Sequence, residues 1–207
     1  MSMVTIDTLI ASLAKPGIHL GYRCVAEGDE KALMPQEARF FSRAAAGVRR
    51  RSGAARIVAR GLLEHLDHRE FAITKARSGA PLWPPGIVGS LAHDETMAVA
   101  AVARATNFSQ LGIDIEPAET LPDKLAELVS TPAERLRYGR RFLERPHLFA
   151  AKEAVYKAVH PSDGIFLDYR DIEIDLESGT GRTSYGKIVR VGVVASADHV
   201  IALAYER

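Results

Sequence analysis

The spacing of apolar and polar residues divides the chain into helices and strands. Its first part predicts a helix, a strand, a long helix and a short strand, at 5–14, 18–26, 43–66 and 71–74. A loop follows at 78–86, because its consecutive prolines fit neither a helix nor a central strand. No internal repeat is apparent along the chain.

The second part begins with three closely spaced strands, predicted at 87–93, 97–104 and 110–116. The middle strand is apolar on both faces, which predicts that it lies buried at the centre of a sheet. Helices are then predicted at the capping box Thr131-Pro132-Ala133-Glu134 and from Pro146 to about His160. Three further strands are expected at 172–176, 187–194 and 199–205.

This order of elements predicts an α+β fold of two similar lobes, residues 1–107 and 108–207. The 207 residues are 47% hydrophobic and 26% charged, which excludes a disordered tail, a collagen and a coiled-coil rod. The net charge of +1 gives no global argument for nucleic acid or membrane. Arg outnumbers Lys by 20 to 7, and this bias favours forked contacts to phosphate or carboxylate groups.

Three features predict a soluble cytoplasmic protein. Cys24 is the single cysteine, so no intrachain disulfide is possible and a reducing compartment is expected. The longest strongly apolar run, 97–103, is far too short for a bilayer span. The N-terminus has no basic region before an apolar stretch, so no secretory signal is expected.

A pair of carboxylates lies on the predicted strand at 110–116. Period-two alternation puts Asp114 and Glu116 on one face together with Gly112, with Cα atoms roughly 7 Å apart. Two hard oxygen donors at this spacing suit Mg²⁺ better than zinc. An edge strand with a solvated polar face explains the same pattern more simply.

The helix from Pro146 carries a second group of charges. Its apolar stripe consists of Leu148, Ala151, Val155 and Val159. Glu153 and Lys157 lie one turn apart on another face, and Lys152 lies beside them. One interpretation is an ordinary surface ion pair between Glu153 and Lys157. In the other, Glu153 is a third carboxylate for a metal, and the two lysines neutralise a bound phosphate.

Histidine and arginine add candidates for phosphate binding. His93 ends a predicted strand and either donates to a ligand or packs against the protein. An arginine-rich helix carries Arg49, Arg50, Arg51, Arg56 and Arg60. Most of these are expected on a solvated face, and one or two could bind a phosphate. Nucleic-acid binding is less favoured, because the helix lacks an aromatic stacking platform and a known docking motif.

Four motifs in a fixed order closely resemble the phosphopantetheinyl transferase superfamily. They are Pro81-Leu82-Trp83-Pro84, Gly89-Ser90-Leu91-Ala92-His93, Leu111-Gly112-Ile113-Asp114-Ile115-Glu116-Pro117 and Phe149-Ala150-Ala151-Lys152-Glu153-Ala154-Val155-Tyr156-Lys157. The chain looks most like the bacterial Sfp-type group that includes enterobactin synthase component D. The resemblance implies two similar α+β lobes with coenzyme A between them. It also implies transfer of the 4′-phosphopantetheine arm to a serine of an acyl or peptidyl carrier protein, in siderophore or other secondary metabolism.

The resemblance also implies roles for single residues. Asp114, Glu116 and Glu153 would hold Mg²⁺, for which Mn²⁺ could substitute, and Lys157 would contact the phosphates. The predicted catalytic residues are therefore Glu153, Lys157 and Asp114, and either Glu153 or a metal-bound water takes the serine proton. The coenzyme pocket would be lined by Arg49, Arg56, Lys75, Ser90, His93, Lys152 and Lys157.

Two positions depart from the family's usual pattern. Ala92 stands where a serine usually precedes the histidine, and Ala150 stands where Ser or Thr usually follows the aromatic residue. Neither position carries the metal or the phosphate lysine, so activity is expected to survive.

Other functions and the partner surface stay open. A non-catalytic module that binds coenzyme A or a carrier protein is the alternative to an enzyme. Four arginines are one candidate rim for an acidic carrier protein, although a solvated face is simpler: Arg135, Arg137, Arg140 and Arg141. A monomer is expected, because two lobes in one chain already build the cleft.

Overall fold

A computed structural model describes residues 5–207 and contains two antiparallel sheets flanked by helices. The helices are α1 (Ile6–Leu13), α2 (Pro35–Ala38), α3 (Ala46–Glu64), α4 (Asp123–Val129), α5 (Pro132–Arg137), α6 (Arg140–Leu143) and α7 (His147–Asp163), with the short 3₁₀ helices η1 (Asp29–Ala32), η2 (Arg39–Phe41) and η3 (Tyr169–Asp171). The strands are β1 (Ile18–Cys24), β2 (Ile87–His93), β3 (Met97–Arg104), β4 (Gln110–Pro117), β5 (Ile172–Asp175), β6 (Thr180–Thr183), β7 (Ile188–Ala195) and β8 (His199–Glu206). The predicted α+β class with two lobes is confirmed.

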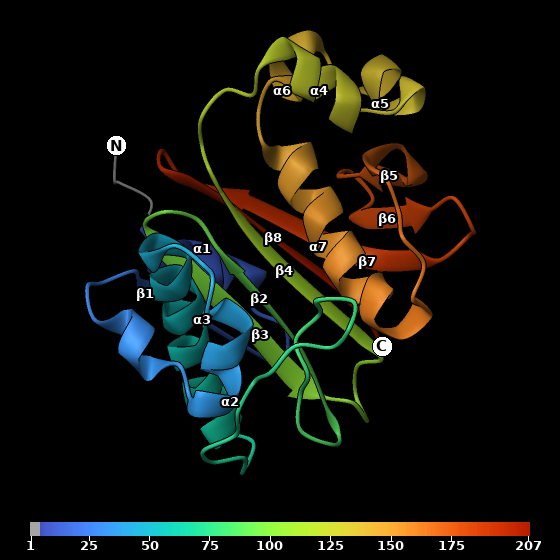
Figure 1. Cartoon of the computed structure of the whole chain (residues 1–207). Coiled ribbons are helices and arrows are strands. Elements are labelled where there is room, and N and C mark those ends of the chain that lie inside the picture. The colour runs from blue at the N-terminus through green and yellow to red at the C-terminus, as the bar shows by residue number, and fades with distance from the viewer. Residues whose placement is uncertain (1–4) are drawn as a thin grey trace.

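The first sheet has the strand order β1-β3-β2, and α3 lies across one of its faces (Figure 1). The prediction that the middle strand is central and buried is confirmed. On β3, Ala100 and Val102 pack beneath α3, whereas Val99 and Ala101 face the opposite side. Alternate residues of this strand therefore serve two separate cores.

The second sheet has the order β4-β8-β7-β6-β5, and α7 packs across one of its faces (Figure 1). The predicted apolar stripe of α7 is confirmed, because Leu148, Ala151, Val155 and Val159 are all buried against the sheet. The helix extends past His160 and ends at Gly164, whose φ of 66° lies in the left-handed region that glycine adopts readily.

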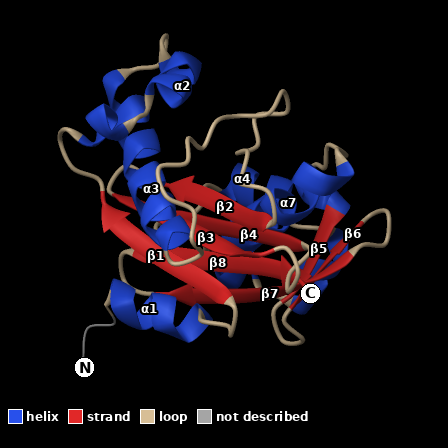
Figure 2. Ribbon diagram, turned by 90° about the horizontal axis from the view of Figure 1, so that it is seen from below, coloured by secondary structure: helices blue, strands red, loops and turns tan. Residues whose placement is uncertain are grey.

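Helix α1 covers the face of the sheets that is opposite to α3 (Figure 2). Its Leu9 and Leu13 pack in one cluster with Val99 of the first sheet and Ile201 of the second. Leu13 also reaches β7 at Gly192. One apolar core thus runs beneath both sheets.

Residues 1–4 of the predicted lobe 1–107 lie outside the described residues, and the lobe boundaries stay a prediction.

The strand predicted at 71–74 is wrong. Next to this segment the structure has only an isolated bridge between Lys75 and Pro81. The N–H of Ile73 donates to Glu37 Oε1 (2.7 Å), and its carbonyl accepts from Arg56 Nε (3.0 Å). Side chains from distant parts of the sequence therefore occupy the backbone groups that a strand ladder needs.

Several short elements were missed from the sequence. Among them, helix α2 and strand β6 have four residues each, which is too short to show a period. Strand β6 passes close to α7 at Gly181, where a Cβ would lie 2.6 Å from Val155 Cγ2.

Among the helices in residues 5–207, none has the length and hydropathy that a membrane span needs.

Candidate active site

A cavity of about 410 Å³ lies between the first sheet and α7. One wall is formed by α3, β2 and the loop at 75–81, and it includes Arg56, Lys75, Ser90 and His93. The other wall is formed by α7 and includes Glu153, Tyr156, Lys157 and His160. The cavity therefore brings together predicted residues that are far apart in the sequence.

The acidic strand β4 turns its polar face toward α7. Ile113 and Ile115 are buried in the core beneath α1, so Asp114 and Glu116 project from the opposite face, as the alternation predicts. Gly112 does not leave open space, contrary to the sequence-based interpretation. A Cβ at this position would overlap the carbonyl oxygen of Ala154, so glycine allows the α7 backbone to pack directly on β4.

This close packing places Lys157 of α7 next to Asp114 of β4. Lys157 Nζ donates to Asp114 Oδ1 at 2.6 Å. Burial alone would lower the pKa of Lys157, but the nearby carboxylates of Asp114, Glu153 and Glu116 raise it instead. Lys157 is therefore cationic at neutral pH.

The carboxylates repel one another in this site. Burial raises the pKa of Asp114, although Lys157 partly offsets this. Burial also raises the pKa of Glu116, and the charges of Asp114 and Glu153 add to the effect. A cation bound among the three groups would relieve both the burial and the repulsion.

The donor atoms fit a divalent metal. Asp114 Oδ2 is buried and has no hydrogen-bond partner, so a hard cation could use it. Within residues 5–207, no three acidic, His or Cys side chains are placed so that they could hold a metal ion by themselves. Mg²⁺ commonly takes one or two carboxylates and completes its shell with water and phosphate. The site therefore suits a metal that is held jointly with a phosphorylated ligand.

Glu153 has a hydrogen-bond partner that the sequence motifs do not include. Tyr169 Oη donates to Glu153 Oε1 at 3.0 Å. Burial and the charge of Glu153 raise the pKa of Tyr169, so the phenol stays protonated and keeps donating. Tyr169 lies in η3, and no local pattern in the sequence distinguishes it from a packing tyrosine.

The opposite wall of the cavity is basic. Arg56 and Lys75 both stack on the ring of Phe41, with distances of 4.9 and 4.5 Å to its centroid. Burial lowers the pKa of each, and the nearby Arg56 lowers that of Lys75 further. The buried Glu37 lies 3.7 Å from Arg56 and also pairs with Arg60, so one carboxylate faces three cations and the net positive charge of this wall favours an anionic ligand.

His93 and Ser90 line the cavity beside these cations, as predicted. Desolvation by the cavity walls lowers the pKa of His93, and Arg51 and Lys157 lower it further by charge repulsion. His93 is therefore neutral at pH 7 and has one ring N–H to donate. Trp83 supports this wall, because a Cβ on Gly89 would lie 2.7 Å from its ring.

Lys152 does not contribute to the cavity, which corrects the sequence-based prediction. Its side chain is 0% exposed. Its ammonium donates to Glu134 Oε2 (2.7 Å), the Val129 carbonyl (2.7 Å) and the Tyr169 carbonyl (2.9 Å). All three N–H groups are thus used within the fold, and none is left for a ligand.

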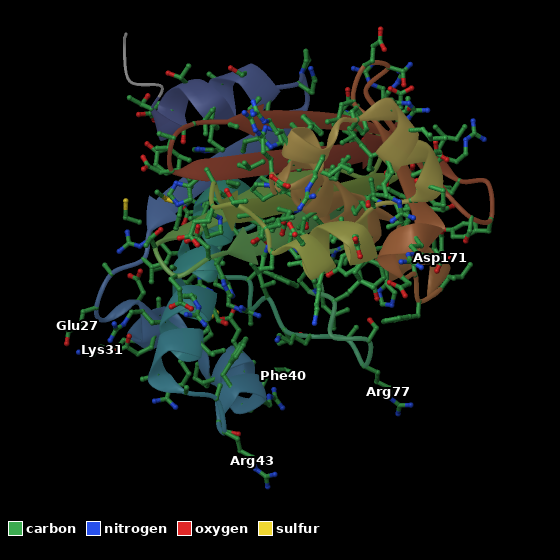
Figure 3. All side chains as sticks on the ribbon, turned by 90° about the horizontal axis from the view of Figure 1, so that it is seen from above. Glu27, Lys31, Phe40, Arg43, Arg77 and Asp171 are labelled. Carbon is green, nitrogen blue, oxygen red and sulfur yellow. The ribbon has the colours of Figure 1, made fainter. Side chains whose placement is uncertain are left out.

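Arg49 is also absent from the cavity wall, because its guanidinium donates to the Ala44 carbonyl (2.8 Å). Other arginines of α3 have acidic partners: Arg50 pairs with Glu30, Arg51 pairs with Glu95, and Arg56 and Arg60 share Glu37. Arg43, ahead of this helix, projects from the surface (Figure 3). This helix therefore presents few unpaired cations to a nucleic acid.

The proposed basic rim is also largely paired within the protein. Arg140 pairs with Asp123 and Glu144, and Arg137 pairs with Glu173. Arg135 donates to the carbonyls of Glu127 and Ser130. Arg135 and Arg141 form no ion pair among residues 5–207, and of the four only Arg141 also lacks a side-chain hydrogen bond there.

The two departures from the family pattern have different surroundings. Ala92 borders the cavity, but it is buried and packs in the core beneath α1. Ala150 is fully buried in the core beneath α7, so a hydroxyl there would not reach the cavity.

Two family models match the chain. The model of the 4′-phosphopantetheinyl transferase N-terminal domain matches residues 36–103. The model of the 4′-phosphopantetheinyl transferase superfamily matches residues 110–204. The connection between β3 and β4 separates the two matches.

Curated relatives carry related names. 4′-Phosphopantetheinyl transferase PptT of Mycobacterium tuberculosis is 34% identical over 188 residues, which are 87% of this chain and 83% of that protein. 4′-Phosphopantetheinyl transferase Svp of Streptomyces mobaraensis is 37% identical over 155 residues, and the match spans 72% of this chain and 63% of that protein. Enterobactin synthase component D of Escherichia coli K12 is 37% identical over 99 residues, which are 44% of this chain and 46% of that protein.

Proposed function

The chain belongs to the 4′-phosphopantetheinyl transferase superfamily, and on that basis we propose that it transfers the 4′-phosphopantetheine arm of coenzyme A to a serine of an apo acyl or peptidyl carrier protein. The other product is adenosine 3′,5′-bisphosphate. The arrangement of charges around the cavity is the main support for this proposal. The α7 wall has Lys157 beside a group of carboxylates, and the facing wall has Arg56 and Lys75. This arrangement suits coenzyme A, which carries a pyrophosphate and a separate 3′-phosphate.

The reaction is attack by an alcohol on a phosphorus of the pyrophosphate. The serine oxygen bonds to the phosphorus that bears the pantetheine arm, and the bond from this phosphorus to the bridging oxygen breaks. Such transfers depend on positioning and charge neutralisation more than on covalent help from the protein.

Lys157 neutralises charge on the departing phosphate in this mechanism, because it is cationic and lines the cavity, whereas its partner Asp114 lies behind the lining. Asp114, Glu116 and Glu153 hold Mg²⁺, or Mn²⁺ in its place, and the ion adds charge neutralisation at the pyrophosphate when it is bound. Glu153 takes the proton of the serine hydroxyl. Its position on the α7 wall supports this role.

The other wall binds the nucleotide end of coenzyme A. Arg56 and Lys75 pair with the 3′-phosphate, and neutral His93 and the hydroxyl of Ser90 donate hydrogen bonds beside them. The buried position of Arg56 and the half-buried position of Lys75 support this assignment, because a bound phosphate offsets the cost of their desolvation.

The proposal extends to the cellular context. The protein acts as a cytoplasmic monomer with lobes at 1–107 and 108–207, and it modifies carrier proteins of siderophore or other secondary-metabolite synthesis. The name of the Escherichia coli relative, enterobactin synthase component D, supports the choice of pathway.

The direct test incubates the protein with coenzyme A, Mg²⁺ and an apo carrier protein, and weighs the carrier by intact mass spectrometry. We expect a gain of one phosphopantetheine arm that a chelator abolishes. No gain across acyl and peptidyl carriers, in the presence of coenzyme A binding, would overturn the enzymatic proposal in favour of a binding module.

A variant of Glu153 separates the enzyme from a binding module. Glu153→Gln should lose turnover and still bind coenzyme A, because the opposite wall is unchanged. Glu173→Gln is the matched control, since Glu173 is a surface carboxylate that pairs with Arg137 away from the cavity. Equal turnover in the two variants would remove the role of Glu153.

A further inference from the structure

Tyr169 is the one neutral side chain that donates a hydrogen bond to Glu153 among residues 5–207. Its hydroxyl lies 3.0 Å from Oε1. The hydrogen bond occupies one oxygen of the carboxylate and leaves Oε2 free to face a cation or a proton donor. Tyr169 belongs to none of the four motifs, and its position 16 residues after Glu153 shows no helical or strand relationship to it.

The pose of Tyr169 is fixed from three sides. Its N–H donates to Asp168 Oδ1 (2.6 Å), which caps η3. Its carbonyl accepts from the buried Lys152 (2.9 Å), and its ring packs on Phe149 with centroids 5.5 Å apart. A phenol held in this way gives its hydrogen-bond partner a defined direction.

Glu153 depends on this donor because the described residues give it no other. It forms no ion pair among residues 5–207, since the ammonium of Lys157, one turn along α7, donates to Asp114 instead. Without a donor, a half-buried carboxylate on a helix turns toward solvent, where its charge is best hydrated.

We propose that Tyr169 is the positioning residue for Glu153, and that its hydroxyl holds this carboxylate at the cavity wall. The inference rests on the proposed function for its effect on catalysis, but its effect on metal binding does not. Lys152 contributes indirectly, because it anchors the backbone of Tyr169 from inside the fold.

The variant Tyr169→Phe tests this, because it keeps the ring and removes only the hydroxyl. We expect Mn²⁺ affinity, measured by electron paramagnetic resonance of the free ion, to fall about 10-fold or more, in the range found for partners of metal ligands. We also expect kcat to fall by a similar factor while the KM for coenzyme A is unchanged, because the basic wall is not affected.

Tyr185→Phe is the matched control. Tyr185 Oη donates to Asp163 Oδ2 at 2.6 Å, so this variant also removes a tyrosine–carboxylate hydrogen bond, but outside the cavity. It should leave Mn²⁺ affinity and kcat unchanged. If both variants lower the melting temperature equally and only Tyr169→Phe weakens Mn²⁺ binding, a general structural role is excluded.

Unchanged Mn²⁺ affinity and kcat in Tyr169→Phe would overturn the inference. If the wild type transfers no phosphopantetheine but Tyr169→Phe still weakens Mn²⁺ binding, the proposed function fails and the positioning role stands. Should Tyr169→Phe be unstable, Phe149→Leu provides a second test. It keeps the hydroxyl, loosens the ring, and should weaken Mn²⁺ binding by a smaller factor.

Discussion

Glu37 and Glu134 have the same role in the two lobes. Each is the last residue of an x-Pro-x-Glu segment, Met34–Glu37 and Thr131–Glu134, whose proline begins a short helix. Each carboxylate is fully buried and accepts from the backbone N–H at the start of its segment, at 2.9 and 2.7 Å.

Two further contacts are the same for Glu37 and Glu134. Each carboxylate accepts at 2.7 Å from an isoleucine N–H, that of Ile73 or Ile174. Each also binds a cation from the long helix of its lobe, Arg60 on α3 or Lys152 on α7. The lobes therefore share a structural element whose only sequence trace is a proline and a glutamate.

Replacing Glu134 by Gln should destabilise the protein by about 3–5 kcal/mol, because it leaves the buried Lys152 without its counter-charge. Urea unfolding measures the change. The double variant Glu134→Met with Lys152→Met should recover part of the loss, since no charge is then left buried. A loss below about 1 kcal/mol in the single variant would contradict the buried pair.

Gly112→Ala should force β4 and α7 apart, because its Cβ would overlap the Ala154 carbonyl. We expect a loss of about 1–3 kcal/mol in unfolding free energy, together with slower transfer, since Asp114 moves away from Lys157. Gly61→Ala is the control. No atom lies within 4 Å of a Cβ at Gly61, so this helix variant should stabilise by about 0.5–1 kcal/mol.

Lys157→Met should change metal binding and catalysis in opposite directions. The ammonium occupies Asp114 Oδ1, so its removal should tighten Mn²⁺ binding in the absence of coenzyme A. Turnover should nevertheless fall on the order of 100-fold, because charge on the leaving phosphate is no longer neutralised. Lys187→Met, whose lysine pairs with Glu206, should change neither quantity. Weaker Mn²⁺ binding in Lys157→Met would count against competition between the lysine and the metal.

The contribution of His147 to stability should fall below pH 6.5. Burial and the charge of Arg145 lower the pKa of His147, and its Nδ1 is buried without a partner. The unfolded chain, with an ordinary histidine pKa of about 6.5, then binds the proton more readily than the folded protein. The stabilisation is complete above that pH and is lost as the pH falls toward the folded-state pKa.

The check compares melting temperatures at pH 7.5 and 5.5 for the wild type, His147→Phe and the exposed-site control His65→Gln. His147→Phe should lose less on acidification than the wild type does. If all three proteins lose equally, His147 is not the group responsible.

The sequence predicted best those features that depend on a local period. Alternation along β4 was sufficient to place Asp114 and Glu116 on one face. Lys152 was assigned to the wrong face although a signal was present. It lies four residues after Leu148 and three before Val155, which is the spacing of the buried stripe. Its charge suggested exposure, but its partners Glu134 and Val129 come from other helices.

Features that depend on distant residues could not be predicted in this way. The segment at 71–74 has the composition of a strand, but the N–H and carbonyl of Ile73 bond to Glu37 and Arg56. Tyr169 reaches Glu153 only because the turn after α7 brings η3 back beside the helix. Neither relationship has a spacing that can be recognised along the chain.

The core beneath α1 makes the two halves of the chain interdependent. Leu9 and Leu13 pack against both sheets, so cutting the connection between β3 and β4 would leave each fragment with an uncovered apolar face. Each fragment would also carry only one wall of the cavity. The two pieces should therefore behave as a split protein that acquires structure, and the ability to bind coenzyme A, only when they reassociate.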